Sequence, residues 1–89
     1  SNIEKKESKV NVKNFSYIIK IADFYFMKSA KLMKKRILEE TNINKININK
    51  MSNTNFIVFL GPFNDLNTLK NAFNAISVLE FENLEIIKQ

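Results

Sequence analysis

Cysteine and histidine are both absent from the sequence, and glycine and proline occur once each. Without cysteine, a disulfide framework and thiolate chemistry are excluded, and without either residue so are the common zinc sites. Without histidine there is no imidazole to act as a general base, which removes most hydrolytic mechanisms. The lack of cysteine leaves the cellular compartment open, because an exported domain with a sufficient core needs no disulfides.

The sequence also lacks a long apolar run. None approaches the roughly 18 to 20 residues that cross a bilayer, and the first residues have no signal-peptide core. Ser1 and Asn2 look like a remnant of expression cloning, so we expect the natural protein to continue upstream, where an anchor or export signal could lie. We expect residues 1–14 to be this remnant and a flexible linker, followed by one domain over residues 15–89.

The length and composition fit one small globular domain. The 89 residues are 45% hydrophobic and 26% charged, which leaves no room for two independent cores. A chain of this size buries only about 60 to 65% of the surface that its unfolded form exposes, so an enzyme with its own enclosed cavity is not expected. The acid pairs Asp23 with Asp65 and Glu39 with Glu40 have no partner base. We therefore expect a non-catalytic binding module without cofactor or metal.

Positive charge is concentrated in the first half of the chain. Twelve of the 14 Lys and Arg residues, but only five of the nine Asp and Glu residues, lie in residues 1–50. Asparagine, lysine, isoleucine and phenylalanine have AT-rich codons, so the asparagine-rich stretch 42–49 is interpreted mainly as genome composition. We interpret one cluster of basic residues as a solvated helix surface in preference to a site for an acidic partner or anionic lipid. It comprises Lys28, Lys31, Lys34, Lys35 and Arg36.

An internal repeat is the most informative feature. The segment YIIKIADF at residues 17–24 recurs as FIVFLGPF at residues 56–63. Both read aromatic, Ile, β-branched, variable, aliphatic, small, variable, Phe, which is typical of a strand closed by a turn. Their near-continuous apolarity predicts two central strands. We expect Gly61 and Pro62 to serve the turn, glycine through its backbone freedom and proline through its fixed φ.

Each of these strands is followed by a helical pattern. The apolar face of the first helix is expected to contain Phe26, Ala30, Met33 and Ile37. The second helix is expected to begin near Asn64 or Asp65, either of which can cap it. Its apolar face is expected to contain Leu66, Leu69, Phe73 and Ile76.

Two further strands complete the pattern. Residues 46–49 alternate with period two, and the polar residues 52–55 can turn the chain back into the strand at 56–63. Residues 84–88 supply a last strand. The order β-α-β-β-α-β predicts an α+β fold of the ferredoxin-like, split βαβ type. We expect a four-stranded antiparallel sheet with the two repeat strands at its centre and both helices on one face.

Side-chain alternation divides each central strand between a covered and an open face. Lys20 indicates the open face, because an unpaired ammonium beneath two helices would be costly. The open set then comprises Ile18, Lys20, Ala22, Ile57, Phe59 and Gly61, while Tyr17, Phe24, Phe56 and Phe63 fall in the core. Apolar groups at the centre of an uncovered sheet indicate a binding surface, which a ligand, the N-terminal tail or a second copy of the chain could cover.

These residues resemble a known family. The small-x-Phe sequence at residues 22–24, the helix with Ala30, Met33 and Ile37, and above all VFLGPF at residues 58–63 are similar to the SPOR (sporulation-related repeat) domain. The likeness covers residues 15–88, and the common Gly-Pro-Phe tripeptide gains specificity from its place between a strand and a helix. The resemblance implies a module of the bacterial periplasm or cell envelope that targets a larger protein to the division site. It would bind peptidoglycan glycan strands stripped of stem peptides on its open sheet face.

The sequence departs from the family at polar positions of the two repeat strands. The family's first-strand Gln and Gly fall on Lys20 and Ala22, and its third-strand Arg falls on Ile57. Lys20 can only donate hydrogen bonds and Ile57 offers none, so polar contacts to glycan are reduced. We expect Phe59 to pack on a sugar face and Lys20 to bind a lactyl carboxylate of muramic acid. The glycan-binding residues implied are Lys20, Phe59, Ile57, Ile18, Asp23 and Asn55, the last two at the rim.

Alternative interpretations remain open. A SPOR-like domain that has lost glycan binding would dock another protein or self-associate through Ile18, Ile57 and Phe59. Lys20 could instead be a solvated lysine whose stem shields apolar neighbours. RRM domains share the element order, but residues 56–63 lack their Lys/Arg-Gly-aromatic signature and the basic cluster lies behind the proposed sheet face. Nucleic acid is therefore not expected, and a membrane is expected as a partner only through the missing N-terminal part.

Overall fold

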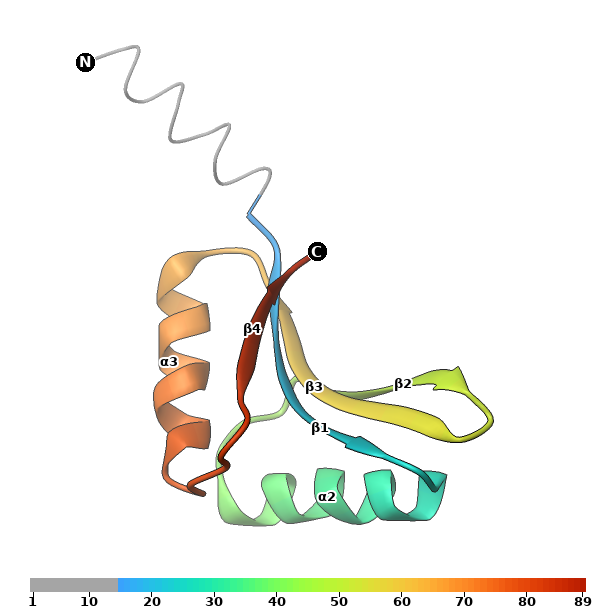
Figure 1. Ribbon diagram of the computed structural model, residues 1–89. Helices are drawn as coiled ribbons and strands as arrows, with labels where there is room; N and C mark the ends of the chain where they lie inside the picture. Colours follow the sequence, from blue (N-terminus) through green and yellow to red (C-terminus); the bar gives the residue numbers. More distant parts are fainter. Residues whose placement is uncertain (1–14) are drawn as a thin grey trace, which may run out of the picture.

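The computed structural model describes residues 15–89, which form one antiparallel sheet and two helices (Figure 1). The elements are β1 (Tyr17–Phe24), α2 (Met27–Glu40), β2 (Ile46–Ser52), β3 (Asn55–Phe63), α3 (Leu66–Ser77) and β4 (Glu85–Lys88). The strand order is β2-β3-β1-β4, which confirms the predicted α+β fold with β1 and β3 paired at its centre. The remnant and linker expected in residues 1–14 lie outside the described residues.

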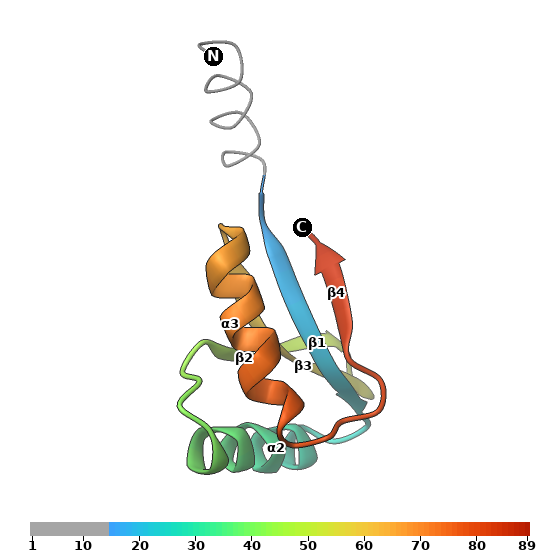
Figure 2. The same ribbon diagram turned by 90° about the vertical axis from the view of Figure 1, so that its left-hand side faces the viewer.

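Both helices cover the same face of a strongly twisted sheet. Helix α2 contacts β2, β3 and the end of β1, whereas α3 contacts β1 and β3 at the other half of the sheet (Figures 1 and 2). The buried core lies between these two layers. Its fully buried side chains are Ile19, Val58 and Leu60 from the sheet, Ala30 and Ile37 from α2, and Ile76 from α3. Burying an aliphatic side chain of this size contributes about 1.5 to 3 kcal/mol to folding.

Helix α2 packs through Ala30, Met33 and Ile37, as its spacing predicted, but not through Phe26. The prediction for Phe26 was wrong, because the residue is the N-cap of the helix, has extended backbone angles and is 63% exposed. The helical spacing therefore does not apply to Phe26, and its side chain does not join the buried face of α2.

Helix α3 begins at the predicted cap. The Asp65 carboxylate accepts a hydrogen bond from the Thr68 backbone N–H at 2.9 Å, which satisfies one of the free donors of the first turn. Leu66 was predicted to face the core, but it is exposed. The buried stripe runs through Leu69, Ala72 and Ile76, so it begins one turn later than predicted and does not include Leu66 at the start of the helix.

A bulge in β1 changes which face its last residues occupy. Lys20 lies opposite Phe59, but Ala22 lies opposite Val58, so β1 has one residue more than β3 over this step. As a result, Ala22 packs against the core, and Asp23 reaches the open face opposite Ile57. The prediction that Ala22 lies on the open face was therefore wrong, because simple alternation does not hold across a bulge.

A second bulge lies in β3, where a turn was predicted. Tyr17 pairs with Phe63 and Ile19 with Leu60, so Gly61 and Pro62 form an irregular step inside the strand. Gly61, the single glycine of the chain, has a φ of 109°, and the peptide bond that follows it is cis. Side chains of β2 and the loop before it hold this step: Asn47 donates to the Gly61 carbonyl at 2.7 Å, and the Lys45 ammonium donates to the Pro62 carbonyl at 3.1 Å.

Neither helix in residues 15–89 is long and apolar enough to cross a membrane.

Candidate functional site

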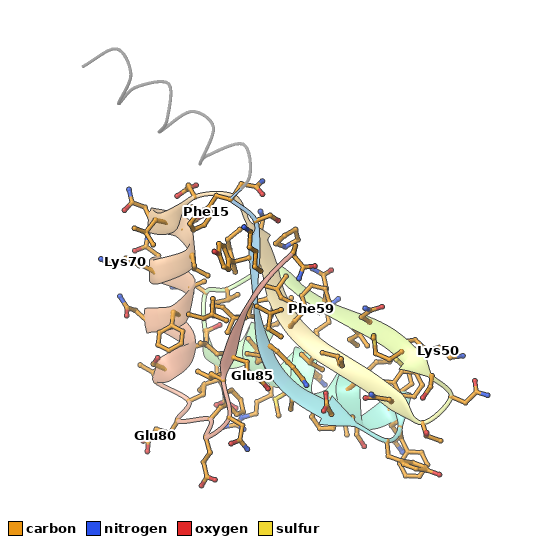
Figure 3. All side chains as sticks on the ribbon, turned by 45° about the horizontal axis from the view of Figure 1, so that its top comes forward. Phe15, Lys50, Phe59, Lys70, Glu80 and Glu85 are labelled. Carbon is orange, nitrogen blue, oxygen red and sulfur yellow. The ribbon has the colours of Figure 1, made fainter. Side chains whose placement is uncertain are left out.

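The open face of the sheet presents side chains from all four strands in register. Directly opposite residues of antiparallel strands point to the same face. One row therefore crosses the whole sheet, from Asn47 on β2 through Phe59 on β3 and Lys20 on β1 to Glu85 on β4. This row is called the central row below. Figure 3 shows Phe59 over the middle of the sheet and Glu85 on the β4 edge.

Two shorter rows flank the central row. On one side, Asn49, Ile57 and Asp23 lie opposite one another on β2, β3 and β1. On the other side, Ile18 of β1 lies opposite Ile87 of β4. Alternation along β3 also places Asn55 on this face, beyond Ile57. The six residues that the sequence predicted as a site therefore share one face of the sheet and are spread along it, from Ile18 at one end through Phe59, Lys20, Ile57 and Asp23 to Asn55 at the hairpin end.

The apolar residues of this face are half-buried. Ile18, Ile57, Phe59 and Ile87 are each partly exposed, whereas their neighbours on the covered face, such as Ile19, Val58 and Leu60, have no exposed surface. Neither helix within residues 15–89 lies over this face of the sheet, since both cover the opposite face (Figures 1 and 2). These four residues, on β3, β1 and the edge strand β4, are called the apolar strip below.

Lys20 is paired within its own strand. Its ammonium lies 2.9 Å from Asp23 Oδ1 and donates to Asp23 Oδ2 at 3.2 Å. The bulge makes this pair possible, since it places Asp23 on the same face as Lys20. The Lys20 side chain is 21% exposed and that of Asp23 is 54% exposed, so the carboxylate is the more accessible partner. A pair this open to solvent contributes at most about 1 kcal/mol to stability.

A polar depression surrounds this ion pair. It encloses about 270 Å³ and is lined by Lys20, Asp23, Asn83 and Glu85, together with Ile21 and Ala22. One ammonium and two carboxylates give it a net negative charge. The depression therefore favours hydroxyl and amide groups over a further carboxylate, unless a ligand displaces Asp23 from Lys20.

Sequence reasoning missed the asparagines of β2 and the acid of β4. Asn47 and Asn49 flank Phe59 and Ile57, although their stretch was interpreted mainly as genome composition. A register counted from the predicted hairpin would have placed both opposite the central strand. Glu85 lies opposite Lys20, but β4 follows a long connection from α3, so no local turn indicates its register.

The arrangement suits binding through a mixed surface. Phe59 and the isoleucines offer apolar area, the asparagine amides offer donors and acceptors, and the Lys20–Asp23 pair offers one of each. Asn47 already donates to the Gly61 carbonyl, which holds its amide in place and leaves its side-chain oxygen as an acceptor. Within residues 15–89, no three acidic side chains come close enough together to hold a metal ion.

Comparisons with known proteins identified no relative of this chain. No protein-family model, no curated protein and no solved structure matches the chain. The resemblance to the SPOR domain therefore rests on the residues quoted above, and it stays a prediction.

Proposed function

We propose that residues 15–89 form a non-catalytic binding module that binds peptidoglycan glycan strands on the open sheet face. In this proposal, the module lies in the bacterial periplasm or cell envelope, prefers glycan free of stem peptides and targets a larger protein to the division site. The observation that carries the proposal is the central row, in which Phe59 lies between the Asn47 amide and the Lys20 ammonium.

A sugar ring suits the chemistry of this row. The ring has an apolar C–H face and a rim of hydroxyl and acetamide groups, so it needs a flat apolar surface flanked by donors and acceptors. Phe59 and Ile57 supply the apolar surface, with Asn47 and Asn49 on the β2 side and the Lys20–Asp23 pair on the β1 side. Ligand sites commonly combine a mostly apolar lining with a few well-placed polar groups in this way.

The Lys20–Asp23 ion pair makes the role proposed for Lys20 testable. If Lys20 binds a lactyl carboxylate, that carboxylate must compete with Asp23, which already holds the ammonium at 2.9 Å. Replacement of Asp23 by Asn would then free the ammonium and strengthen binding. If instead Asp23 accepts hydrogen bonds from sugar hydroxyls, the same substitution would weaken binding, because an amide is a poorer acceptor than a carboxylate.

The test is co-sedimentation of the chain with purified peptidoglycan sacculi, before and after an amidase removes the stem peptides. We expect more protein to sediment with the treated sacculi. Phe59→Ala and Lys20→Glu should abolish this binding, whereas Lys70→Glu, on the exposed side of α3, is the matched control and should not. Equal sedimentation of wild type and Phe59→Ala, or no sedimentation with either material, would rule out glycan binding through this face.

The apolar strip favours a second candidate, in which the open face docks another protein or a second copy of the chain. Ile18, Ile57 and Ile87 are aliphatic where a glycan site would gain from polar groups, and the Gln and Arg of the SPOR pattern are replaced by Lys20 and Ile57. Sedimentation equilibrium of wild type and Ile57→Lys distinguishes the two. A dimer that Ile57→Lys dissociates, without binding to sacculi, would favour this candidate.

RNA binding in the manner of an RRM domain gains no support from the charge distribution. The basic residues of α2 belong to the helix layer, on the side of the sheet opposite the open face (Figure 2). An RNA gel shift at physiological salt, run beside the sacculus assay, would reveal such binding directly.

A further inference from the structure

Three exposed apolar residues occupy the connection between β1 and α2. Tyr25 is 62% exposed, Phe26 is 63% exposed, and Met27, the first residue of α2, is also exposed. The two aromatic rings pack edge to face with their centroids 4.8 Å apart. Single exposed apolar residues are common on protein surfaces, but a contiguous group of large ones indicates contact with a partner. Residues 25–27 are called the aromatic loop below.

Within residues 15–89, the lysines that follow the aromatic loop form no ion pair. Helix α2 carries Lys28, Lys31, Lys34, Lys35 and Arg36 before its first acid, Glu39. In the part of the chain that the structure describes, the ion pairs are Lys20 with Asp23 and Arg36 with Glu40. Arg36 also lies over the Phe81 ring at 5.2 Å, which gives it a structural role. The lysines remain as uncompensated positive charge, and Lys28, Lys31 and Lys35 are exposed.

Helix stability does not explain these residues. The positive end of a helix dipole is at the N-terminus, where acids stabilise and cations destabilise. Helix α2 has no acid in its first turn and no base in its last turn, so its charges oppose the dipole. Its N-cap, Phe26, makes no side-chain hydrogen bond, although Asp65 does so in α3. Local rules of stability are most often broken where a residue serves a function.

The β2–β3 hairpin adds to the same end of the molecule. Phe24, just before the aromatic loop, and Lys50 of β2 both pair with Phe56 of β3. The hairpin tip and the start of α2 accordingly lie at one end of the fold, where Lys50 is labelled (Figures 1 and 3). Met51, next to Lys50, is also exposed. The basic–aromatic surface is therefore defined by Tyr25, Phe26, Met27, Lys28, Lys31 and Lys50.

We propose that the basic–aromatic surface binds the anionic surface of a lipid bilayer, with the aromatic loop inserted at the level of the headgroups. Tyrosine and other amphipathic or apolar side chains are favoured at that depth, and apolar residues beside lysines are typical of interfacial membrane binding. Each lysine near an anionic bilayer strengthens binding about fivefold. This inference does not depend on glycan binding, since the surface shares no residue with the site proposed for glycan on the open sheet face.

The arrangement of the rings favours a bilayer over RNA. Bases stack on flat aromatic faces, and the edge-to-face contact between Tyr25 and Phe26 covers one of these faces, which leaves less stacking surface for a base. Met27, next to Phe26, and Met51, next to Lys50, are flexible and apolar, which suits acyl chains, and their sulfur atoms are only weak hydrogen-bond acceptors for RNA.

The absence of tryptophan makes insertion directly measurable. Phe26→Trp introduces the only indole of the chain, and Val78→Trp is a control at an exposed position just after α3. With vesicles of mixed phosphatidylcholine and phosphatidylglycerol, we expect the Phe26→Trp emission to shift to shorter wavelength and the Val78→Trp emission to stay unchanged. Neither should shift with vesicles of phosphatidylcholine alone.

Vesicle co-sedimentation tests the lysines. The double variant Lys28→Gln with Lys31→Gln should bind mixed vesicles roughly 25-fold more weakly, from about fivefold for each lysine. The matched double variant Lys70→Gln with Lys88→Gln should bind like wild type, and circular dichroism should show all variants folded.

Three results would overturn the proposal. The first is that the wild-type protein does not bind mixed vesicles. The second is that the two double variants weaken vesicle binding equally. The third is that the emission wavelength of Phe26→Trp does not shift when the protein is bound to vesicles. Single-stranded RNA that displaces the protein from mixed vesicles, and whose binding survives Tyr25→Ser with Phe26→Ser, would assign the lysines to nucleic acid instead. None of these outcomes bears on sacculus binding, which depends on Phe59 and Lys20.

Discussion

Replacement of Gly61 by Ala is expected to destabilise the domain strongly. Gly61 has a φ of 109°, which side chains rarely allow, and it is the only glycine in the chain. A Cβ atom added there would lie 3.0 Å from Phe63 Cδ2, 3.1 Å from Phe63 Cε2 and 3.1 Å from the Phe63 backbone nitrogen. Phe63 belongs to the buried core, so a shift of its ring would disturb the packing of that core.

Two costs add to give the expected magnitude. A non-glycine residue at positive φ costs about 1 to 2 kcal/mol. Forcing an extra methyl group into a packed core costs about 1 to 3 kcal/mol. The backbone nitrogen cannot turn aside as a side chain can, so we expect a loss of about 2 to 5 kcal/mol in the free energy of unfolding. This is a large share of the roughly 5 to 15 kcal/mol that stabilises a typical domain.

Urea unfolding followed by circular dichroism measures this change. We expect an unchanged slope and a lower midpoint. In thermal unfolding we expect a melting temperature lowered by about 8 °C or more, since each kcal/mol corresponds to about 4 to 8 °C in a domain of this size. Asn64→Ala, a nearby exposed substitution, should stay within about 0.5 kcal/mol of wild type. A Gly61→Ala variant within the same limit would refute the bulge geometry at Gly61.

Three further changes in stability follow from the same structure and can be measured by the same urea experiment. Ile37→Ala should cost about 2 to 5 kcal/mol because Ile37 is fully buried, and the exposed neighbour Leu38→Ala should cost far less; equal losses would contradict the orientation of α2. Asp65→Ala removes the hydrogen bond to the Thr68 N–H and should cost about 1 kcal/mol, and no loss would mean that this cap does not form in solution. Glu80 has a φ of 57°, which is unfavourable for a residue with a side chain, so Glu80→Gly should stabilise the domain by about 0.5 to 1 kcal/mol. A destabilised variant would contradict that backbone angle.

The order of the elements could be read from local patterns. Residues 17–24 and 56–63 form the two central strands that their repeat predicted, and near-continuous apolar runs are typical of strands flanked by other strands on both sides. Asp65 could be recognised as a cap because its side chain acts on a backbone N–H only three residues away. The same periodicity failed for Phe26 and Leu66, since spacing alone does not show where the packed part of a helix begins.

The candidate site could be predicted only in outline. Lys20 was predicted to lie on the open face because its charge makes burial costly. The structure places it there together with Phe59, whereas Ile19, the residue before it, is buried on the covered face. The positions of Asn47 and Asn49 could have been predicted by counting the strand register from the hairpin. The position of Glu85 could not, because its pairing with β1 depends on how α3 and the loop after it return the chain to the sheet.

The sequence by itself determined the element order, the central pair of strands and the face on which Lys20 lies, since these follow from alternation and from the cost of burying charge. Only the tertiary structure decided the details that give the open face its chemistry. The bulge after Lys20 brings Asp23 to that face and pairs the two residues at 2.9 Å, and the Gly61 step is held by side chains from β2 and the loop before it. A bulge depends on contacts between strands far apart in the chain, so no local pattern of residues specifies it.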